Sequence, residues 1–325
     1  MTFLVFVFSF PAQAIGFESF GPFSHRIQNP LYLQLVDLLP ETAQALPKGT
    51  LSGQLDTAFS NIFERSFTNS TDATIDMELF RVTQKLRYGL GNGFEVGVEI
   101  PWIHMEGGFL DPFIQWYHHA LGVPNGGRNR VANNQFRYQI DYQGTTLYQT
   151  GPEAWNIGDI TFVGKKQFQD ETNVWPAMAL RFAIKAPTGD RGEGLGGGNP
   201  GFAFGLDAEK SVRRLHGYLN TFYALDQGND LLGPINRTES LHWSLAGEFN
   251  LSQHVATLLQ LVSSTPVFHS TGQHVLDEIP LDMILGFRGE AKKLFWQAGF
   301  SEDVTSRGPS VDFTLFTSIG YRWKI

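Results

Sequence analysis

The sequence predicts an all-β protein, an antiparallel transmembrane β-barrel of about 12 strands with short periplasmic turns and long extracellular loops. Three observations support this prediction. Apolar and polar residues alternate with period two, long and short connections alternate, and aromatic residues gather near the ends of the alternating segments. Side chains on a strand point alternately to opposite faces, and outer-membrane barrels combine this alternation with uneven connections and aromatic girdles.

The composition excludes several other classes of protein. The 325 residues include 24 basic and 32 acidic side chains, for a net charge of −8. Such a balance argues against a nucleic-acid partner, because phosphate binding needs a surface rich in Lys and Arg. The absence of cysteine excludes disulfides, thiolate metal sites and cysteine nucleophiles. Beyond the N-terminus there is no apolar run long enough for a transmembrane helix.

An apolar run, Phe3 to Phe10, opens the chain and is followed by Ala12-Gln13-Ala14. A run of this length before Ala-x-Ala is typical of a secretory signal peptide. We therefore expect residues 1–14 to be a signal peptide and the rest to be exported. Because no Lys or Arg precedes the run, this signal peptide is either truncated or begins at an upstream codon.

The period-two pattern defines the predicted strands. In the last of them, Val311, Phe313 and Leu315 share a face opposite Asp312 and Thr314. In the segment 74–88 the apolar face changes register at Phe80, which predicts a β-bulge there. The twelve predicted strands are 50–59, 74–88, 94–103, 157–168, 176–186, 201–210, 215–225, 241–249, 255–263, 280–288, 294–303 and 311–323.

The connections predict the orientation and the compartment. The longest connection, 104–156, stands between short ones, and long and short connections follow each other down most of the chain. Short periplasmic turns and longer extracellular loops explain this order. We therefore expect the protein in the outer membrane of a Gram-negative bacterium, with membrane lipid as a partner.

The C-terminal strand ends in Tyr321-x-Trp323, followed by Lys324 and Ile325. This ending resembles the terminal signal that outer-membrane barrels present to their assembly machinery. The resemblance implies the outer-membrane assembly machinery as a second partner.

Two short motifs support a family resemblance. Gln28-Asn29-Pro30-Leu31 lies near the exported N-terminus, and Pro187-Thr188-Gly189-Asp190 follows a predicted strand. With the barrel pattern, they resemble the uncharacterised bacterial outer-membrane family called domain of unknown function 3187, over nearly the whole mature chain. The second motif is also similar to barrels for uptake of aromatic or apolar compounds. Neither resemblance implies a proven substrate or particular functional residues.

Charged residues of both signs fall on the predicted inner face of the barrel. Unpaired charges in a narrow lumen would be costly, so many should pair across strands. Such a lumen is either a narrow polar path or a closed structural core, and the sequence leaves both open. The lumen-lining candidates are Asp76, Glu78, Arg81, Lys85, Arg87, Glu95, Glu99, Asp159, Arg181, Lys185, Glu248, Arg288 and Asp312.

Two segments could close the lumen of the barrel, which we expect over 49–325. Residues 15–48 form an N-terminal pre-barrel or plug segment. Within the long loop 104–156, an acid and a proline precede apolar residues at helical spacing, which predicts a short helix. This helix either packs on the barrel rim or forms a ligand-binding lid. The lid candidates are Phe113, Trp116 and Tyr117.

The sequence provides no convincing enzyme site. His242-x-Ser244 resembles the His-x-Ser of outer-membrane phospholipases and deacylases, but here both residues fall on the predicted lumen face. No acid or amide is placed to orient the histidine. We therefore expect no catalytic, cofactor-binding or metal-binding residues, no cofactor and no enzyme activity.

These observations favour a channel or transporter for a small or apolar solute, which would be the small-molecule partner. Two alternatives remain open at this point. One is a lipid-modifying membrane enzyme of the phospholipase or deacylase type, and the other is a structural barrel with a sealed lumen.

Overall fold

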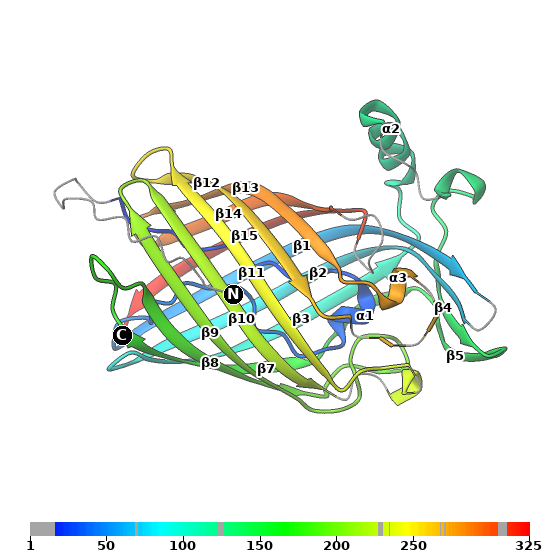
Figure 1. The fold of residues 1–325 in the computed structure, drawn as a ribbon, viewed down its shortest axis with the longest axis horizontal. Helices are drawn as coiled ribbons and strands as arrows, with labels where there is room; N and C mark the ends of the chain where they lie inside the picture. The colour runs from blue at the N-terminus through cyan, green and yellow to red at the C-terminus, as the bar shows by residue number, and fades with distance from the viewer. Residues whose placement is uncertain are drawn as a thin grey trace, which may run out of the picture.

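The computed structural model is a closed antiparallel β-barrel (Figure 1). It describes residues 17–68, 71–122, 127–226, 230–233, 235–266, 268–269, 271–272, 274–304 and 311–325. The predicted signal peptide, residues 1–14, lies outside the described residues. The predicted fold class is confirmed, including the number of strands in the barrel wall, 12.

Each wall strand pairs with the next, and pairing of the last strand with the first closes the barrel. A closed wall leaves no unpaired edge facing lipid. The wall consists of β1 (Thr50–Phe67), β2 (Thr71–Gly91), β3 (Phe94–Glu106), β7 (Ile160–Gln169), β8 (Ala177–Ala186), β9 (Gly201–Val212), β10 (Leu215–Asp226), β11 (Glu239–Asn250), β12 (Val255–Ser264), β13 (Leu281–Ala291), β14 (Leu294–Asp303) and β15 (Phe313–Lys324).

Three shorter strands form inside the predicted loop 104–156. They are β4 (Arg137–Tyr142), β5 (Thr145–Thr150) and β6 (Glu153–Ile157). β4 pairs with the extracellular end of β2, β5 pairs with β4, and β6 pairs with β3. Part of the predicted loop is thus an extension of the wall.

The strands β1 and β2 are much longer than predicted, at 18 and 21 residues. Most of the connection predicted at 60–73 is therefore strand. The β-bulge predicted at Phe80 is wrong, because the β1–β2 register runs unbroken through the pair Phe59 and Phe80, and the register shift in β2 lies at Gly89/Gly91. The apolar residues before Phe80 face the lumen, in phase with Arg81. The apparent slip in the pattern marks a change of environment, not of register.

Burial alternates along the wall as expected for a membrane barrel. In β8, Leu180 and Phe182 are 55% and 47% exposed on the outer face, whereas Arg181 and Ala183 are 3% and 2% exposed on the inner face. The outer face thus offers apolar side chains to lipid, and the charged side chains point inward.

The helical elements are few. α1 (Pro30–Leu33), α3 (His274–Asp277) and the 3₁₀ turns η1 (Arg128–Arg130) and η2 (Asp230–Leu232) are short, and α2 (Asp111–Leu121) has three turns. Pro112 lies in the first turn of α2, and Gly122 ends it with φ of 70°, a left-handed conformation that glycine adopts readily. Within the described part of the chain, no helix is long and apolar enough to cross a membrane.

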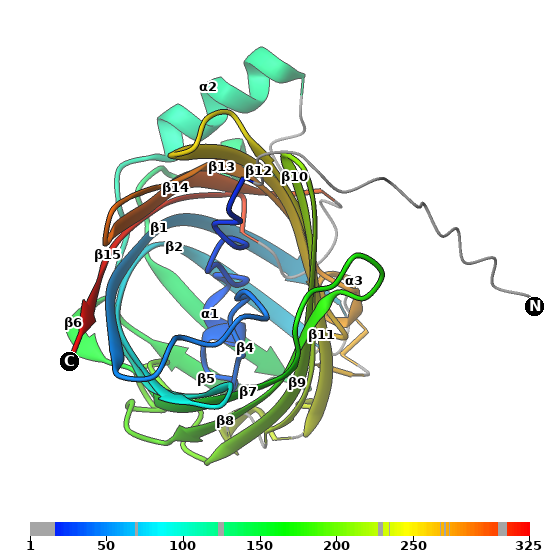
Figure 2. The same cartoon turned by 90° about the vertical axis from the view of Figure 1, so that its left-hand side faces the viewer.

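Residues 17–48, which we call the internal segment, run through the inside of the barrel (Figure 2). Near the extracellular end, Phe23, Ile27 and Leu31 of this segment join the apolar core formed by inward side chains of β1–β3. The lumen is therefore filled by chain rather than left as an open pore.

Candidate functional site

The internal segment forms a hairpin within the lumen. Its first half contacts the wall through backbone groups: Phe20 and Gly21 donate their N–H groups to the Glu248 carboxylate at 3.1–3.2 Å. Phe23 exchanges two hydrogen bonds with the Gln260 amide, at 2.7 and 3.1 Å. The chain turns at α1 and returns to Leu46, whose N–H donates to Glu95 at 2.8 Å.

Charged side chains of both signs on the inner wall bind backbone groups of the internal segment. Lys165, Arg181 and Lys185, on β7 and β8, donate to backbone carbonyls of the segment. Further along the wall, Asp226 and Glu248, on β10 and β11, accept from its N–H groups. Because peptide groups are strong donors and acceptors, a segment without charged side chains at these points still provides partners for wall charges of both signs.

Glu41 of the internal segment binds three cations of the wall. Its carboxylate lies 2.8 Å from Arg87 on β2, 2.9 Å from Lys165 on β7 and 3.4 Å from Arg181 on β8. Asn220 of β10 donates to its carbonyl at 2.7 Å. Glu41 thus ties the returning half of the hairpin to four strands.

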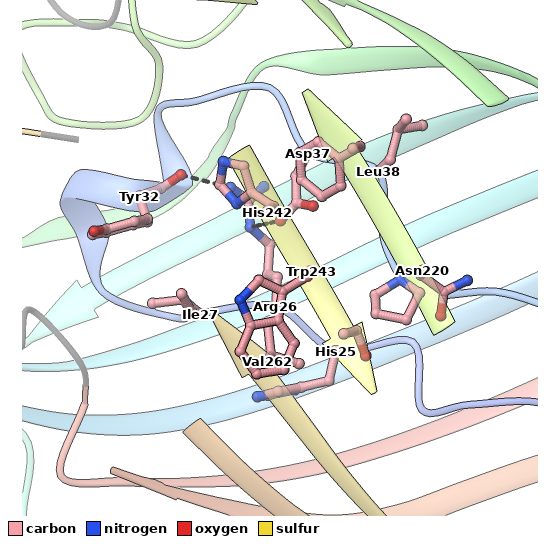
Figure 3. Close-up of a pocket in the computed structure, with 13 residues that line it drawn as sticks. His25, Arg26, Ile27, Tyr32, Asp37, Leu38, Asn220, His242, Trp243 and Val262 are labelled. Carbon is pink, nitrogen blue, oxygen red and sulfur yellow. Dashed lines mark hydrogen bonds and ion pairs between the residues drawn. The ribbon is translucent and has the colours of Figure 1, made fainter. Parts of the chain in front are cut away.

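An ion pair within the internal segment holds the hairpin closed on itself (Figure 3). Arg26 lies 2.9 Å from Asp37 and donates to the Tyr32 carbonyl at 2.5 Å. The adjoining cavity, lined also by His25 and His242, has a volume of about 20 Å³, which is room for one or two water molecules.

A larger cavity of about 110 Å³ lies between the internal segment and the wall. It is lined by the cations Lys85, Arg87, Lys165 and Arg288, and also by Glu41. Its polar lining and its size fit several water molecules. The lumen is thus occupied but not packed throughout at the density of a protein core.

Ten of the sequence-predicted lumen candidates lie on the inward face of the wall, namely Arg81, Lys85, Arg87, Glu95, Glu99, Asp159, Arg181, Lys185, Glu248 and Arg288. Many of them form ion pairs between wall strands. Lys85 lies 2.5 Å from Asp56, and Lys185 lies 2.7 Å from Asp159. Others bind the backbone of the internal segment, as Arg288 does at the Pro22 carbonyl.

Asp76, Glu78 and Asp312 do not line the lumen. Asp76 and Glu78 lie on the outward face of β2, because the strand continues without the bulge and places Arg81 and its neighbours two apart on the inward face. They are nevertheless 6% and 1% exposed, because the loop after β3 covers this part of the outer face. Asp312 lies at the extracellular rim, just before β15.

These three acids belong to a buried extracellular group that we call the Arg128 cluster: Arg128, Asp76, Glu78, Asp111 and Asp312. The Arg128 guanidinium donates to Asp111 and Asp312. Asp111, the first residue of α2, also accepts from Asn61 at 3.1 Å and from the Asn134 N–H at 2.7 Å. Glu78 accepts from the Phe109 N–H at 2.7 Å. The cluster fastens the loop and its helix to the outer face of β1 and β2.

The Arg128 cluster shifts the acidity of its members. Burial raises the pKa of Asp76 to about 6, repulsion by Asp111 and Asp312 adds to this, and Arg128 partly opposes it. At Asp76, burial and repulsion by the neighbouring carboxylates therefore change the pKa more than the attraction of Arg128 does.

The predicted lid residues Phe113, Trp116 and Tyr117 do not cover the mouth of the barrel. α2 projects to the side, beyond the outline of the wall (Figures 1 and 2). The tie between Asp111 and Arg128 places the helix against the outer face, which the spacing of apolar residues alone does not reveal. Of the two alternatives, rim packing and a lid, the position of the helix fits partial packing at the outer rim.

The β4–β5 hairpin covers the internal segment at the extracellular end. Tyr138 and Tyr148 are buried against the apolar core, and Gln34 donates to the Tyr138 hydroxyl at 3.1 Å. The sequence analysis assigned this hairpin to a loop. The alternation of Tyr138, Ile140 and Tyr142 with Gln139 and Asp141 is the signal that would have revealed a strand.

His242 and Ser244 point into the lumen, as expected from the alternation, and are 8% and 3% exposed. The His242 ring stacks on Phe222 with centroids 4.3 Å apart, and its Nε2 atom lies 2.7 Å from the Ser240 hydroxyl. These contacts place the pair away from the lipid face, where a lipid-modifying enzyme would need it.

The sequence matches, over residues 1–324, the family described as "Protein of unknown function (DUF3187)". The chain belongs to the DUF3187 family. This confirms the resemblance inferred from the sequence. A comparison with curated protein sequences finds no significant match.

Among solved structures, the COG4313 outer membrane channel from Pseudomonas putida F1 is similar with a TM-score of 0.56 and 13% identity, covering 88% of this chain and 100% of that one. The translocator domain of the autotransporter NalP from Neisseria meningitidis matches with a TM-score of 0.47 and 10% identity, covering 86% and 90%. The toluene transporter TodX from Pseudomonas putida matches with a TM-score of 0.38 and 6% identity, covering 93% and 99%. The first of these similarities establishes a shared outer-membrane barrel fold.

Proposed function

We propose that this protein is an outer-membrane channel for a small solute, and that the internal segment closes it in the present state. The observation that carries the proposal is the nature of the lumen. A largely charged wall is filled by a mostly irregular segment, which polar contacts hold along its length and apolar side chains hold near the extracellular end. A similar fold in a protein described as an outer membrane channel adds support.

The pairing of charges within the wall favours a removable segment over a sealed core. Lys185 keeps Asp159 at 2.7 Å, Arg87 keeps Glu99 at 2.5 Å, and Arg181 keeps Asp207 at 3.5 Å if residues 17–48 leave. Removing one member of a buried pair is costly mainly when the other is left without a partner. Withdrawal of the internal segment leaves most wall charges paired, and water can hydrate them.

The inner wall supports a small solute with apolar character. Toward the extracellular end, β1–β3 place Ile62, Ile75, Met77 and Leu79 inward, all at most 1% exposed behind the internal segment. Toward the periplasmic end, the lining is charged. A path with this lining offers apolar contacts first and hydration later. We propose a small apolar or amphipathic compound as the solute.

The remaining partner predictions belong to the same proposal. We infer that the assembly machinery recognises the end of β15, where Tyr321 and Trp323 lie on the lipid face, 38% and 44% exposed. We propose no enzymatic activity, since His242 is turned into the lumen and contacts a serine and a phenylalanine ring.

Planar-bilayer recording of the Glu41→Gln variant tests the proposal. Glutamine keeps the shape of Glu41 but weakens the hold of Arg87, Lys165 and Arg181. Hydrogen bonds to charged groups contribute about 1.5–3 kcal/mol, so openings should become about tenfold more frequent or more. Glu18→Gln is the matched control, because the Glu18 side chain is exposed on the same segment.

A variant that lacks residues 17–45 provides the decisive contrast. It should fold as a barrel with heat-modifiable gel migration and pass a steady current. If it folds and passes no current, the channel proposal is wrong and the sealed structural barrel replaces it.

A further inference from the structure

The helix α2 is amphipathic, but its apolar face is turned away from the protein. Asp111, Ile114 and His118 lie against the protein and are 3%, 0% and 5% exposed. Phe113 and Trp116 are 44% and 63% exposed. At 100° per residue, the two aromatic residues share a face that lies opposite the buried one. A helix in water normally has the reverse arrangement.

The Arg128 cluster explains why the helix is held in this orientation. Asp111 accepts hydrogen bonds from Arg128, Asn61 and the Asn134 N–H. These contacts fix the polar side of the first turn to β1 and to the loop. The aromatic face therefore points away from the protein.

The aromatic face is continuous with the lipid-facing wall. The Phe313 ring, on the outward face of β15, lies 6.5 Å from Phe113 and 6.1 Å from Tyr117. It also lies 6.1 Å from Phe300, which is opposite Leu315 on the outward face. A row of rings therefore leads from the barrel wall onto the helix without an intervening polar residue in this chain of contacts.

The position of the helix fits a membrane surface. α2 lies at the extracellular end and extends sideways beyond the wall. Its own axis is transverse to the barrel axis rather than parallel to it (Figures 1 and 2). Interfacial helices lie in the membrane plane with Trp and Phe on the buried face, and Trp and Tyr are enriched where membrane meets water.

We propose that α2 is an interfacial helix that inserts Phe113 and Trp116 into the outer leaflet beside β14 and β15. The occupant of the aromatic face is therefore lipid. Continuity with the lipid-facing wall favours lipid over a second copy of the chain, because the same rings of Phe300 and Phe313 already face the bilayer. This proposal does not depend on whether the lumen conducts.

The absence of cysteine from the sequence allows a clean test by single-cysteine labelling. Phe113→Cys, Trp116→Cys and Gln115→Cys, each carrying an environment-sensitive fluorophore, are reconstituted into phosphatidylcholine–phosphatidylglycerol vesicles. Gln115 is the matched control, because it lies on the same helix turned by 100° from Trp116 and by 160° from Phe113. The labelled side chains lie at the helix surface, and heat-modifiable migration checks that each variant folds.

Lipid insertion predicts that nitroxide-bearing lipids quench the labels at 113 and 116 severalfold more than the label at 115. Iodide in the water should show the reverse order, and emission at 113 and 116 should shift to the blue. Equal quenching by iodide at all three positions would place the helix in water and overturn the proposal.

The same labels in nanodiscs that hold one barrel each separate lipid from a second protein copy. Protection from iodide should persist at 113 and 116, because the lipid is still there. Protection that disappears in single-barrel nanodiscs would mean that another chain covers the face, and this also would overturn the proposal.

Discussion

Charged side chains are buried in two regions of the molecule, the lumen and the Arg128 cluster, and the two regions balance their charge differently. In the lumen, Arg181 has three partners, the Leu39 carbonyl at 2.6 Å, Glu41 at 3.4 Å and Asp207 at 3.5 Å. In the Arg128 cluster, one guanidinium bridges Asp111 and Asp312 while two further acids lie close by.

The comparison teaches that redundancy of partners permits movement, whereas dependence on one group fixes a position. Lumen charges can lose the internal segment and keep a wall partner, which suits a segment that leaves. In the loop that carries α2, Asp111 and Asp312 share the single cation Arg128, which suits a helix whose orientation has to stay constant at the membrane surface. Removing one partner of a buried ion pair is costly mainly because the other is left uncompensated. The two regions should therefore respond differently to substitution.

Substitution of Arg128 by methionine should have the largest effect. It leaves Asp111 and Asp312 buried without their cation, for a local cost of about 3–5 kcal/mol. Hydrogen exchange in residues 107–122 and 127–136 should accelerate accordingly, while the wall strands serve as an internal reference. Arg130→Met, on the exposed side of the same turn, is the control and should change little. Unchanged exchange in Arg128→Met would show that apolar contacts hold the loop.

Adjacent residues of β8 provide the next test, because they face opposite environments. Leu180→Arg puts a charge on the lipid face and should destabilise the barrel by about 2–4 kcal/mol near the bilayer midplane. Arg181→Leu should cost less, about 1.5–3 kcal/mol, because Asp207 keeps Asn220 at 2.8 Å and Glu41 keeps Arg87 and Lys165. Reversible urea unfolding in lipid vesicles measures both. If the order is reversed, the lumen pairs are not redundant.

Much of the wall is predictable from the sequence because a membrane barrel separates its two faces strongly. Leu180 faces lipid and Arg181 faces the lumen, and the period-two alternation of the sequence reflects this difference. The pattern weakens where both faces are covered by protein. In the extracellular part of β2, Ile75 and Met77 face the apolar end of the internal segment, while Asp76 and Glu78 face the loop. The usual rule of polar inside and apolar outside is inverted there, and so the bulge and the lumen assignment failed.

The contacts of the internal segment were beyond prediction for a different reason. Most of them use backbone groups, such as the Phe20 and Val36 N–H groups and the Leu39 carbonyl. Backbone donors and acceptors are the same in every residue, so they leave no pattern in the sequence. Glu41 has a distinctive side chain, but its three cations come from positions 46, 124 and 140 residues away (87 − 41, 165 − 41 and 181 − 41).

The smallest expected effect is a dependence of loop docking on pH. It tests the charge balance of the Arg128 cluster. The pKa of Asp76 is raised to about 6, by burial and by Asp111 and Asp312 against the attraction of Arg128. Asp76 pairs with Arg137 of β4, at the extracellular end of β2. A carboxyl with a raised pKa in the docked loop binds its proton more tightly there than in the open loop. Docking is then fully stabilised below about pH 4 and loses that stability as the pH rises through about 6.

Hydrogen exchange of the loop at pH 5 and pH 8, corrected for intrinsic rates, measures this dependence. The loop should be better protected at pH 5, and by less than the effect of Arg128→Met, because one carboxyl titrates while Arg128 still binds Asp111 and Asp312. Asp76→Asn should flatten the dependence, since asparagine is uncharged at both values. Greater protection at pH 8 would mean that the attraction of Arg128 to its carboxylates is stronger than the repulsion between them. The contrast between a redundantly paired lumen and an acid-rich outer cluster would then be wrong.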